Sequence, residues 1–257
     1  RNNTMGKYNL ISPPIYNYKA SKNLKLNVHT YFLSLAHSDT SGYNVCPKAQ
    51  RLSINENNKN KSNCSYVCVA KNGKGNFPNV KESRVRKTKL FFEDRDKFME
   101  LLYNDIKKAI INSEKENYKP TFRLNAYSDI KWENIKYNGM NLMDHFPDIT
   151  FYDYTKLVNR KIPKNASLTY SYWGNDKDYK IAIEQELNVA MVFDTQNNKN
   201  LPLPSEFNGR KVIDGDLTDL RTKENDGRNV IVGLRAKMSK ANIEKELQKD
   251  ISFVVRA

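Results

Sequence analysis

Three short runs decide the fold class: TFRLNA (Thr121–Ala126), ITFYDY (Ile149–Tyr154) and SLTYSY (Ser167–Tyr172). Each is rich in aromatic and β-branched residues, which are typical of strands. Segments with helical patterning lie between and around them, so strands and helices alternate along the chain. This alternation predicts βα units and a mainly parallel sheet.

Working outward, apolar side chains recur at helical spacing before the first run, and Asp94 stands where it would cap that helix. These apolar residues are Phe98, Leu101, Leu102, Ile106 and Ile110. Helices are also predicted over Asp129–Met143, broken near Gly139, and over Asp176–Gln185 and Ala241–Gln248. The remaining predicted strands are His29–Leu35, Leu187–Phe193, Lys211–Ile213, Asn229–Leu234 and Ile251–Val255. We expect a single-domain α/β fold of the partial (β/α) barrel type.

The predicted domain spans residues 29–257, and residues 1–28 read as an extended N-terminal arm. Residues 36–93 show little periodicity and form a long loop after the first strand. Loops of this length are uncommon in compact domains and are usually functional or anchored. No internal repeat or linker divides the chain.

Composition limits the function classes. The chain has 257 residues, of which 39% are hydrophobic and 28% charged, so it can bury a core. No apolar run is long enough to span a bilayer, no signal peptide opens the chain, and Arg1 suggests that the true start is missing. Three cysteines are too few for a disulfide-dense scaffold. The expected location is the cytoplasm.

All three cysteines, Cys46, Cys64 and Cys68, lie in the long loop with the spacing C-x17-C-x3-C. Three thiolates suit a [4Fe–4S] cluster with one open iron, or a zinc site with His37 as fourth ligand. Three ordinary thiols are the remaining alternative.

Several motifs follow one another in the chain: VCPKA from Val45, CSYVCVAKNG from Cys64, RLNAYSD from Arg123, FYDYTK from Phe151, VIDGD from Val212 and VIVGLRAK from Val230. Over residues 25–255 they resemble the gene product 88 domain family of phages and plasmids. That family in turn resembles radical S-adenosylmethionine (SAM) enzymes. The resemblance implies a partial βα barrel, a [4Fe–4S] cluster, SAM as a further cofactor and a bacterial host. The cysteine spacing departs from the C-x3-C-x2-C of radical SAM enzymes, and their glycine-rich motif is absent.

Polar residues follow the predicted strands, where barrel enzymes keep their active sites. Asp129 and Lys156 are the candidate catalytic residues: Asp129 for a substrate amine or a metal, Lys156 for phosphate or carboxylate. A helix cap and a solvated lysine are the simpler alternatives. The candidate cofactor-binding residues are Tyr66, Ser128, Tyr154, Trp173, Asp214, Arg235 and Lys237.

Two of these groups have specific alternatives. Asp214 and Asp216 suit Mg²⁺ or a simple turn, and Trp173 suits a stacked base or core packing. Arg235 and Lys237 point to the same side of a strand and suit an anionic ligand.

The net charge of +14 favours a partner that carries phosphate. Basic residues interleaved with aromatic ones form the candidate nucleic-acid surface: Lys71, Arg84, Arg86 and Lys87. A coding bias toward lysine and asparagine is the alternative. Nucleotide-hydrolysing and dinucleotide-binding motifs are absent.

Three functions follow. The first is a radical SAM-like iron–sulfur enzyme acting on nucleic acid or a nucleotide. The second is a DNA- or RNA-binding accessory protein on a degenerate barrel, with structural zinc or free thiols. The third is a Mg²⁺-dependent nuclease using Asp129, Asp214 and Asp216.

Overall fold

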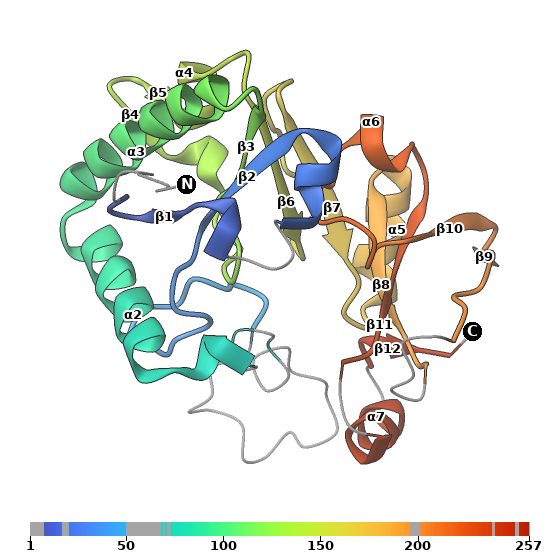
Figure 1. The fold of residues 1–257 in the computed structure, drawn as a ribbon. Coiled ribbons are helices and arrows are strands. Elements are labelled where there is room, and N and C mark those ends of the chain that lie inside the picture. The colour runs from blue at the N-terminus through green and yellow to red at the C-terminus, as the bar shows by residue number, and fades with distance from the viewer. Residues whose placement is uncertain are drawn as a thin grey trace.

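One large, mostly parallel sheet organises the chain, with α-helices packed beside it (Figure 1). The computed structural model describes residues 8–16, 21–49, 68, 70, 73–195, 201–237, 240–249 and 252–256. The sheet strands are β1 (Ile11–Ser12), β2 (Val28–Leu33), β3 (Lys119–Arg123), β6 (Thr150–Thr155), β7 (Ala166–Ser171), β8 (Asn188–Phe193), β9 (Glu206–Phe207), β10 (Arg210–Asp214), β11 (Ile231–Arg235) and β12 (Val254–Val255). The helices of the described part are α2 (Pro78–Glu93), α3 (Arg95–Lys115), α4 (Leu142–His145), α5 (Asp176–Glu184), α6 (Lys223–Asp226) and α7 (Lys240–Leu247). A separate hairpin joins β4 (Lys136–Tyr137) to β5 (Met140–Asn141). The predicted mixed α/β class is confirmed.

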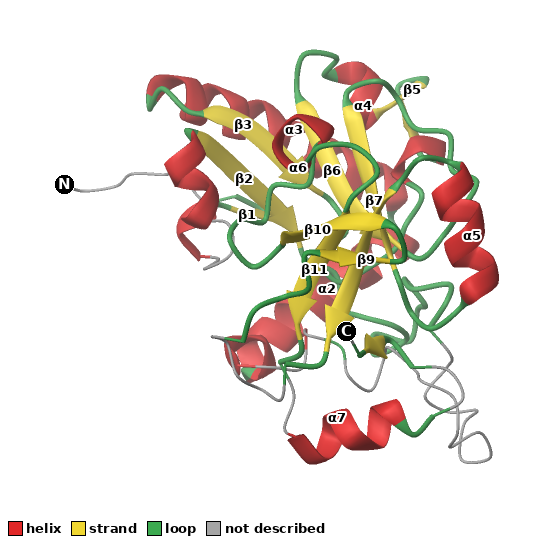
Figure 2. Cartoon of the chain, turned by 90° about the vertical axis from the view of Figure 1, so that its right-hand side faces the viewer, coloured by secondary structure: helices red, strands yellow, loops and turns green. Residues whose placement is uncertain are grey.

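The strand order of the sheet is β1-β2-β3-β6-β7-β8-β11-β10-β9. Every pairing from β2 through to β10 is parallel, and the short strands β1 and β9 add antiparallel edges. Figure 2 shows β2, β3, β6 and β7 side by side in chain order. Order then changes, because β11 lies between β8 and β10. Among the described residues no pairing joins β1 to β9, so a closed barrel is not formed by these strands.

The C-terminal strand enters the sheet beside β8. β7 pairs with residues 188–190 of β8, whereas β12 pairs with Val192 and Phe193. β11 pairs with the opposite edge of β8 from Val189 to Phe193, so β7 and β12 share one edge in succession. This arrangement brings Phe253 to the carboxyl end of the sheet.

Aromatic rings tie β2, β3 and β6 together on the face that α3 covers. Tyr31, Phe122 and Phe151 lie in register on neighbouring strands, with ring centroids 5.5 and 5.6 Å apart. The apolar stripe of α3 packs into the same core cluster. Asp94 caps α3 by accepting a 3.0 Å hydrogen bond from the Lys97 amide, so the predicted cap and helix are confirmed.

Two predictions of local structure are wrong. Residues 78–93 form α2, whereas a loop was predicted there. The sequence did not indicate this helix because its buried residues are mostly polar and give no apolar stripe. The predicted helix over 129–143 is a 3₁₀ turn, a hairpin and the short α4. Asn138 and Gly139 have φ of 48° and 86°, the left-handed values that a tight hairpin turn requires.

The predicted N-terminal arm is not extended throughout, because Pro14–Tyr16 and Lys22–Leu26 form 3₁₀ helices. Strand β1 pairs with β2, and the buried Asp105 carboxylate of α3 binds the main chain at the start of β1. Its oxygens accept hydrogen bonds from the amides of Asn9 at 2.9 Å, Leu10 at 2.7 Å and Ile11 at 3.3 Å. This segment is therefore fixed to the domain. Within the described residues, no helix is both long enough and apolar enough to cross a membrane.

Candidate functional site

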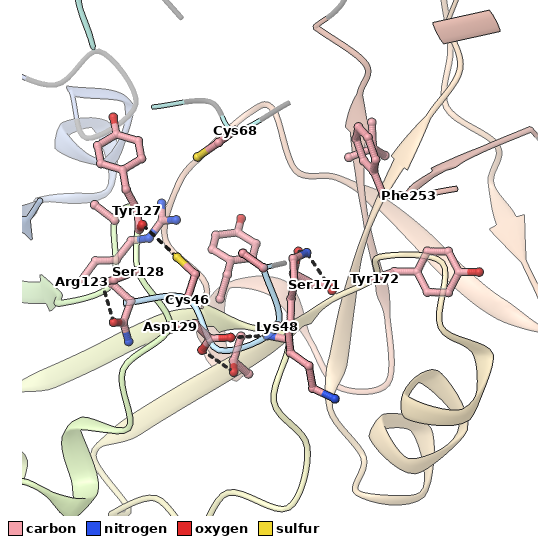
Figure 3. A pocket seen from close by; sticks show the side chains of 17 residues that line it. Cys46, Lys48, Cys68, Arg123, Tyr127, Ser128, Asp129, Ser171, Tyr172 and Phe253 are labelled. Carbon is pink, nitrogen blue, oxygen red and sulfur yellow. Dashed lines mark hydrogen bonds between the residues drawn. The ribbon is translucent and has the colours of Figure 1, made fainter. Parts of the chain in front are cut away.

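A cavity of about 240 Å³ lies at the carboxyl ends of the parallel strands (Figure 3). Residues at the carboxyl ends of β3, β6 and β7 and directly after them line it, together with Val192 of β8 and Phe253 before β12. The loop after β2 adds Cys46, Lys48, Ala49 and Cys68. Parallel strands end on one edge of a sheet, which is why residues distant in sequence meet there.

Two cysteines line this cavity. The Cys46 sulfur donates a 3.5 Å hydrogen bond to the Tyr127 carbonyl oxygen and accepts one of 3.4 Å from the Ser38 amide. Cys68 lies at the same cavity, above Cys46 in the view of Figure 3. The predicted residues Cys64 and Tyr66 lie outside the described residues. Within the described part, no group of three histidine, cysteine or acidic side chains could hold a metal ion.

Asp129 joins the ends of two strands. Its amide donates to the Val45 carbonyl at 2.8 Å, which ties Asp129 to the loop after β2 that carries Cys46 and Cys68 (the cysteine loop). Its carboxylate accepts hydrogen bonds from the Thr155 hydroxyl at 2.7 Å and the Lys156 amide at 2.8 Å, and Arg160 lies 3.6 Å away. Burial raises the pKa of Asp129, while these donors and the Arg160 charge oppose the rise. Both oxygens are therefore used within the protein.

Lys156 and Tyr154 present their side chains to the cavity from the end of β6. The Lys156 ammonium donates to the hydroxyl of Ser171 at 3.1 Å and to its carbonyl at 3.4 Å. The Arg123 guanidinium lies 4.7 Å from the centre of the Tyr154 ring. Burial raises the pKa of Tyr154 to about 12, so its hydroxyl is neutral at physiological pH.

Asn125 is the polar hub beneath the cavity. Its side-chain oxygen accepts from the Ser128 hydroxyl, the Ile130 amide and the Trp132 indole at 2.8, 2.9 and 3.2 Å. Its amide group donates to the Ile130 carbonyl at 3.0 Å and to Asp153 at 3.1 Å. Ser128, a predicted binding residue, is thus oriented by Asn125 at the cavity wall.

Buried charges support the floor of the site. Arg123 lies 3.1 Å from Asp219 and 4.0 Å from Asp153. Tyr152 also donates to Asp219, at 3.3 Å. Burial raises the pKa of Asp153 to about 7, although the positive charge of Arg123 opposes the shift.

The family model for Gene product 88 matches residues 11–254, which include every strand of this sheet except the last residue of β12. The chain belongs to the Gene product 88 family. Comparisons with curated proteins and with solved structures gave no match. The chemistry of this family member must therefore be argued from its own cavity.

Four predicted residues lie away from the cavity in this Gene product 88 protein. Asp214 and Arg235, at the ends of β10 and β11, form an ion pair at 2.9 Å. Asp216 lies 3.0 Å from Lys237 and 3.4 Å from Arg235. Burial raises the pKa of Asp216, but hydrogen bonds from Arg235 and Lys237 outweigh it and lower the pKa below its ordinary value. These predicted ligand-binding residues form ion pairs with one another and do not line the cavity.

Trp173 is also placed differently. It packs against the apolar cluster around Tyr170 and Val189 and does not line the cavity. The Lys48 ammonium lies 5.6 Å from the centre of its ring and 2.9 Å from Asp178. Core packing, the simpler alternative for Trp173, describes its position.

Two of the four residues of the predicted nucleic-acid surface are buried. Arg84 and Lys87 are buried in α2, and the Lys87 ammonium donates to the Leu10 carbonyl at 2.9 Å. Burial lowers the pKa of Lys87 to about 8, and the charges of Arg84 and Arg86 act in the same direction. Arg86 is exposed, and Lys71 lies outside the described residues. In a helix, residues two positions apart lie on opposite faces, so Arg84 is buried while Arg86 is exposed. This segment was predicted to be a loop, so the sequence did not indicate the difference.

Arg84 instead fastens the end of the cysteine loop. It donates to the carbonyls of Ala70 at 3.1 Å and Gly75 at 3.2 Å, and its guanidinium lies 4.3 Å from the centre of the Tyr127 ring. We expect Arg84→Ala to lower the free energy of unfolding by about 3 kcal/mol, since two charge-assisted hydrogen bonds and a cation–π contact are lost. Urea denaturation followed by circular dichroism measures this. The exposed neighbour Arg86→Ala serves as control and should change stability by less than about 0.5 kcal/mol. Equal losses in the two variants would contradict the assignment.

Several residues at the site were not singled out from the sequence. They are Lys48, Arg123, Asn125, Ser171 and Phe253. Lys48 lies in VCPKA, and Arg123 and Asn125 lie in RLNAYSD, so the motifs contained a signal. Ser171 and Phe253 carry none, because only the pairing of β12 with β8 brings Phe253 to this edge.

Proposed function

We propose that this Gene product 88 protein is a radical SAM-like iron–sulfur protein that acts on nucleic acid or a nucleotide in the cavity at the carboxyl edge of its sheet. The observation that supports it most is the position of Cys46 and Cys68, which line one cavity with Asp129 and Lys156. In open α/β sheets, ligands bind at this edge. A reducing bacterial cytoplasm, of a phage or plasmid host, suits such thiols.

The donor set fits a thiolate-bound centre by its chemistry. Cys46 and Cys68 supply two sulfur atoms at the cavity, and Cys64 stands four positions before Cys68 in the sequence. Three cysteine thiolates hold a [4Fe–4S] cluster that keeps one iron open. Such a cluster supplies one-electron chemistry when bound, and SAM is its expected co-reactant.

The sheet supports the barrel-like part of the proposal. β2, β3, β6, β7 and β8 are parallel neighbours in chain order, as in a partial βα barrel, and the cysteine loop follows the first of them. The insertion of β11 beside β8 departs from that order.

The chain's own residues have separate tasks in this proposal. Lys156 offers an ammonium group to an anionic substrate. Asp129 has both carboxylate oxygens occupied by Thr155 and Lys156, so it positions the end of β6 rather than reacting. Tyr154 supplies a ring surface at the cavity wall.

Anaerobic purification tests the proposal. The protein should be brown, absorb near 400 nm and contain about four iron atoms per chain. Cys46→Ser, Cys64→Ser and Cys68→Ser should each abolish the colour and the iron, whereas Thr40→Ala, an exposed change in the same loop, should retain both. A colourless protein that contains zinc would contradict it and favour the accessory-protein alternative.

The other two functions have less support. His37 lines a different cavity, next to α2, from the one that Cys46 and Cys68 line. This placement does not support a zinc site in which His37 is the fourth ligand. A nuclease needs Asp129, Asp214 and Asp216 around one metal. Asp214 and Asp216 are instead ion-paired with Arg235 and Lys237, away from Asp129.

A further inference from the structure

Lys156 differs from the other basic residues at the cavity in its partners. Arg123 is paired with Asp219 at 3.1 Å, and Lys48 with Asp178 at 2.9 Å. The Lys156 ammonium forms no ion pair with any carboxylate of the described residues, and its hydrogen bonds go to the neutral Ser171. A half-buried cation with only neutral partners favours an anionic ligand.

An acidic residue at the cavity, Asp129, does not remove this preference. The charges of Asp129 and Lys156 interact at longer range than an ion pair. Its carboxylate oxygens, however, accept from the Thr155 hydroxyl and the Lys156 main-chain amide, and Arg160 lies 3.6 Å away. The Lys156 ammonium is therefore available to a group that enters the cavity.

Aromatic side chains complete the wall around this ammonium. Tyr127, Tyr154 and Phe253 line the cavity, whereas the Tyr172 ring points away from it and packs against Tyr179. Figure 3 shows Tyr127 and Cys68 on one side and Phe253 on the other. Ring surfaces of this kind stack on a nucleobase, and such stacking tolerates any base.

The positions of the basic residues disfavour a polymer as the ligand. Two of the residues expected to hold a nucleic-acid backbone, Arg84 and Lys87, are buried and donate to carbonyl groups of the chain itself.

We propose that the cavity binds a single nucleoside monophosphate, with Lys156 on its phosphate and the aromatic wall against its base. This inference rests on the proposed function for placing the substrate in this cavity, and it narrows the substrate from nucleic acid to a mononucleotide.

Calorimetric titration of the full-length protein tests the binding. The probes are the 5′-monophosphates of adenosine and uridine, the two nucleosides, and a short oligothymidine without a terminal phosphate. The monophosphates should bind roughly tenfold to a hundredfold more tightly than the nucleosides. Lys156→Gln should remove this advantage and leave nucleoside binding unchanged. Lys156→Arg, which keeps the charge, should retain most of it, and Lys89→Gln, an exposed charge change on α2, should retain all of it.

Two results would overturn the inference: nucleoside and monophosphate binding with equal affinity, or oligothymidine binding most tightly with no response to Lys156→Gln. The titration does not depend on iron, so its outcome is separable from that of the cysteine variants. Nucleotide binding by a colourless anaerobic protein would reject the iron–sulfur proposal and keep the mononucleotide site. A brown protein indifferent to phosphate would do the reverse.

Discussion

Asn125→Ala should lower the free energy of unfolding by about 4 kcal/mol, because one buried side chain satisfies several buried polar groups at once. Asn125 is 2% exposed. Its loss would leave the Ile130 amide and carbonyl, the Trp132 indole and the Ser128 hydroxyl without these hydrogen bonds, and would remove one donor from Asp153. Each unsatisfied buried group costs about 1–3 kcal/mol, and local rearrangement recovers part of the sum. Urea denaturation followed by circular dichroism measures the change.

A matched control separates this network from the general effect of removing an asparagine side chain. Asn104 is exposed on α3, and Asn104→Ala should alter stability by less than about 0.7 kcal/mol, since alanine has the higher helix propensity. A loss below about 1.5 kcal/mol for Asn125→Ala would mean that water replaces the missing partners and that Asn125 is not the hub.

The elements that the sequence predicted well are those whose burial leaves a periodic apolar pattern. α3 buries Phe98, Leu102 and Ile106, and β8 is apolar from Val189 to Phe193, so both elements were predicted to within a few residues. α2 was missed because Arg84, Lys87 and Thr88 form most of its buried face. A polar buried face leaves no apolar period in the sequence. The burial of Arg84 and Lys87 is explained by the main-chain carbonyl groups to which they donate.

The site was predictable to the extent that strand ends locate it. Ser128, Asp129, Tyr154 and Lys156 were expected at one edge, and they line the same cavity as Cys46. Asp214 and Arg235 also lie at strand ends, but β10 and β11 are paired neighbours, so their charges meet each other. Strand order decides between these outcomes, and the position of β11 next to β8 cannot be derived from the periodicity of either strand.

The free energy of unfolding should fall as the pH rises from about 4 to about 7, because of the buried carboxyl group of Asp153. Burial raises the pKa of its carboxyl group to about 7 in the folded protein, from an ordinary value of 3.8, with Arg123 and Arg160 opposing the shift and Asp129 adding to it. The folded state therefore keeps a proton that the unfolded state releases above its own pKa. The stabilisation by this bound proton is complete below about pH 4 and is lost as the pH passes about 7. It contributes at most about 4 kcal/mol to the free energy of unfolding.

Asp153→Asn removes this titration, so its free energy of unfolding should fall less steeply over the same pH window than that of the wild type. Urea unfolding at half-unit steps of pH measures both slopes. The pKa of Asp129 is also raised by burial and leaves a residual slope of the same sign, whereas the lowered pKa of Asp216 gives a smaller slope of the opposite sign near its own range. Asp148→Asn, which removes an exposed carboxylate beyond the core, should preserve the wild-type profile. If Asp153→Asn and the wild type had parallel profiles, Asp153 would be ionised throughout, and the Arg123 charge would outweigh the effect of burial.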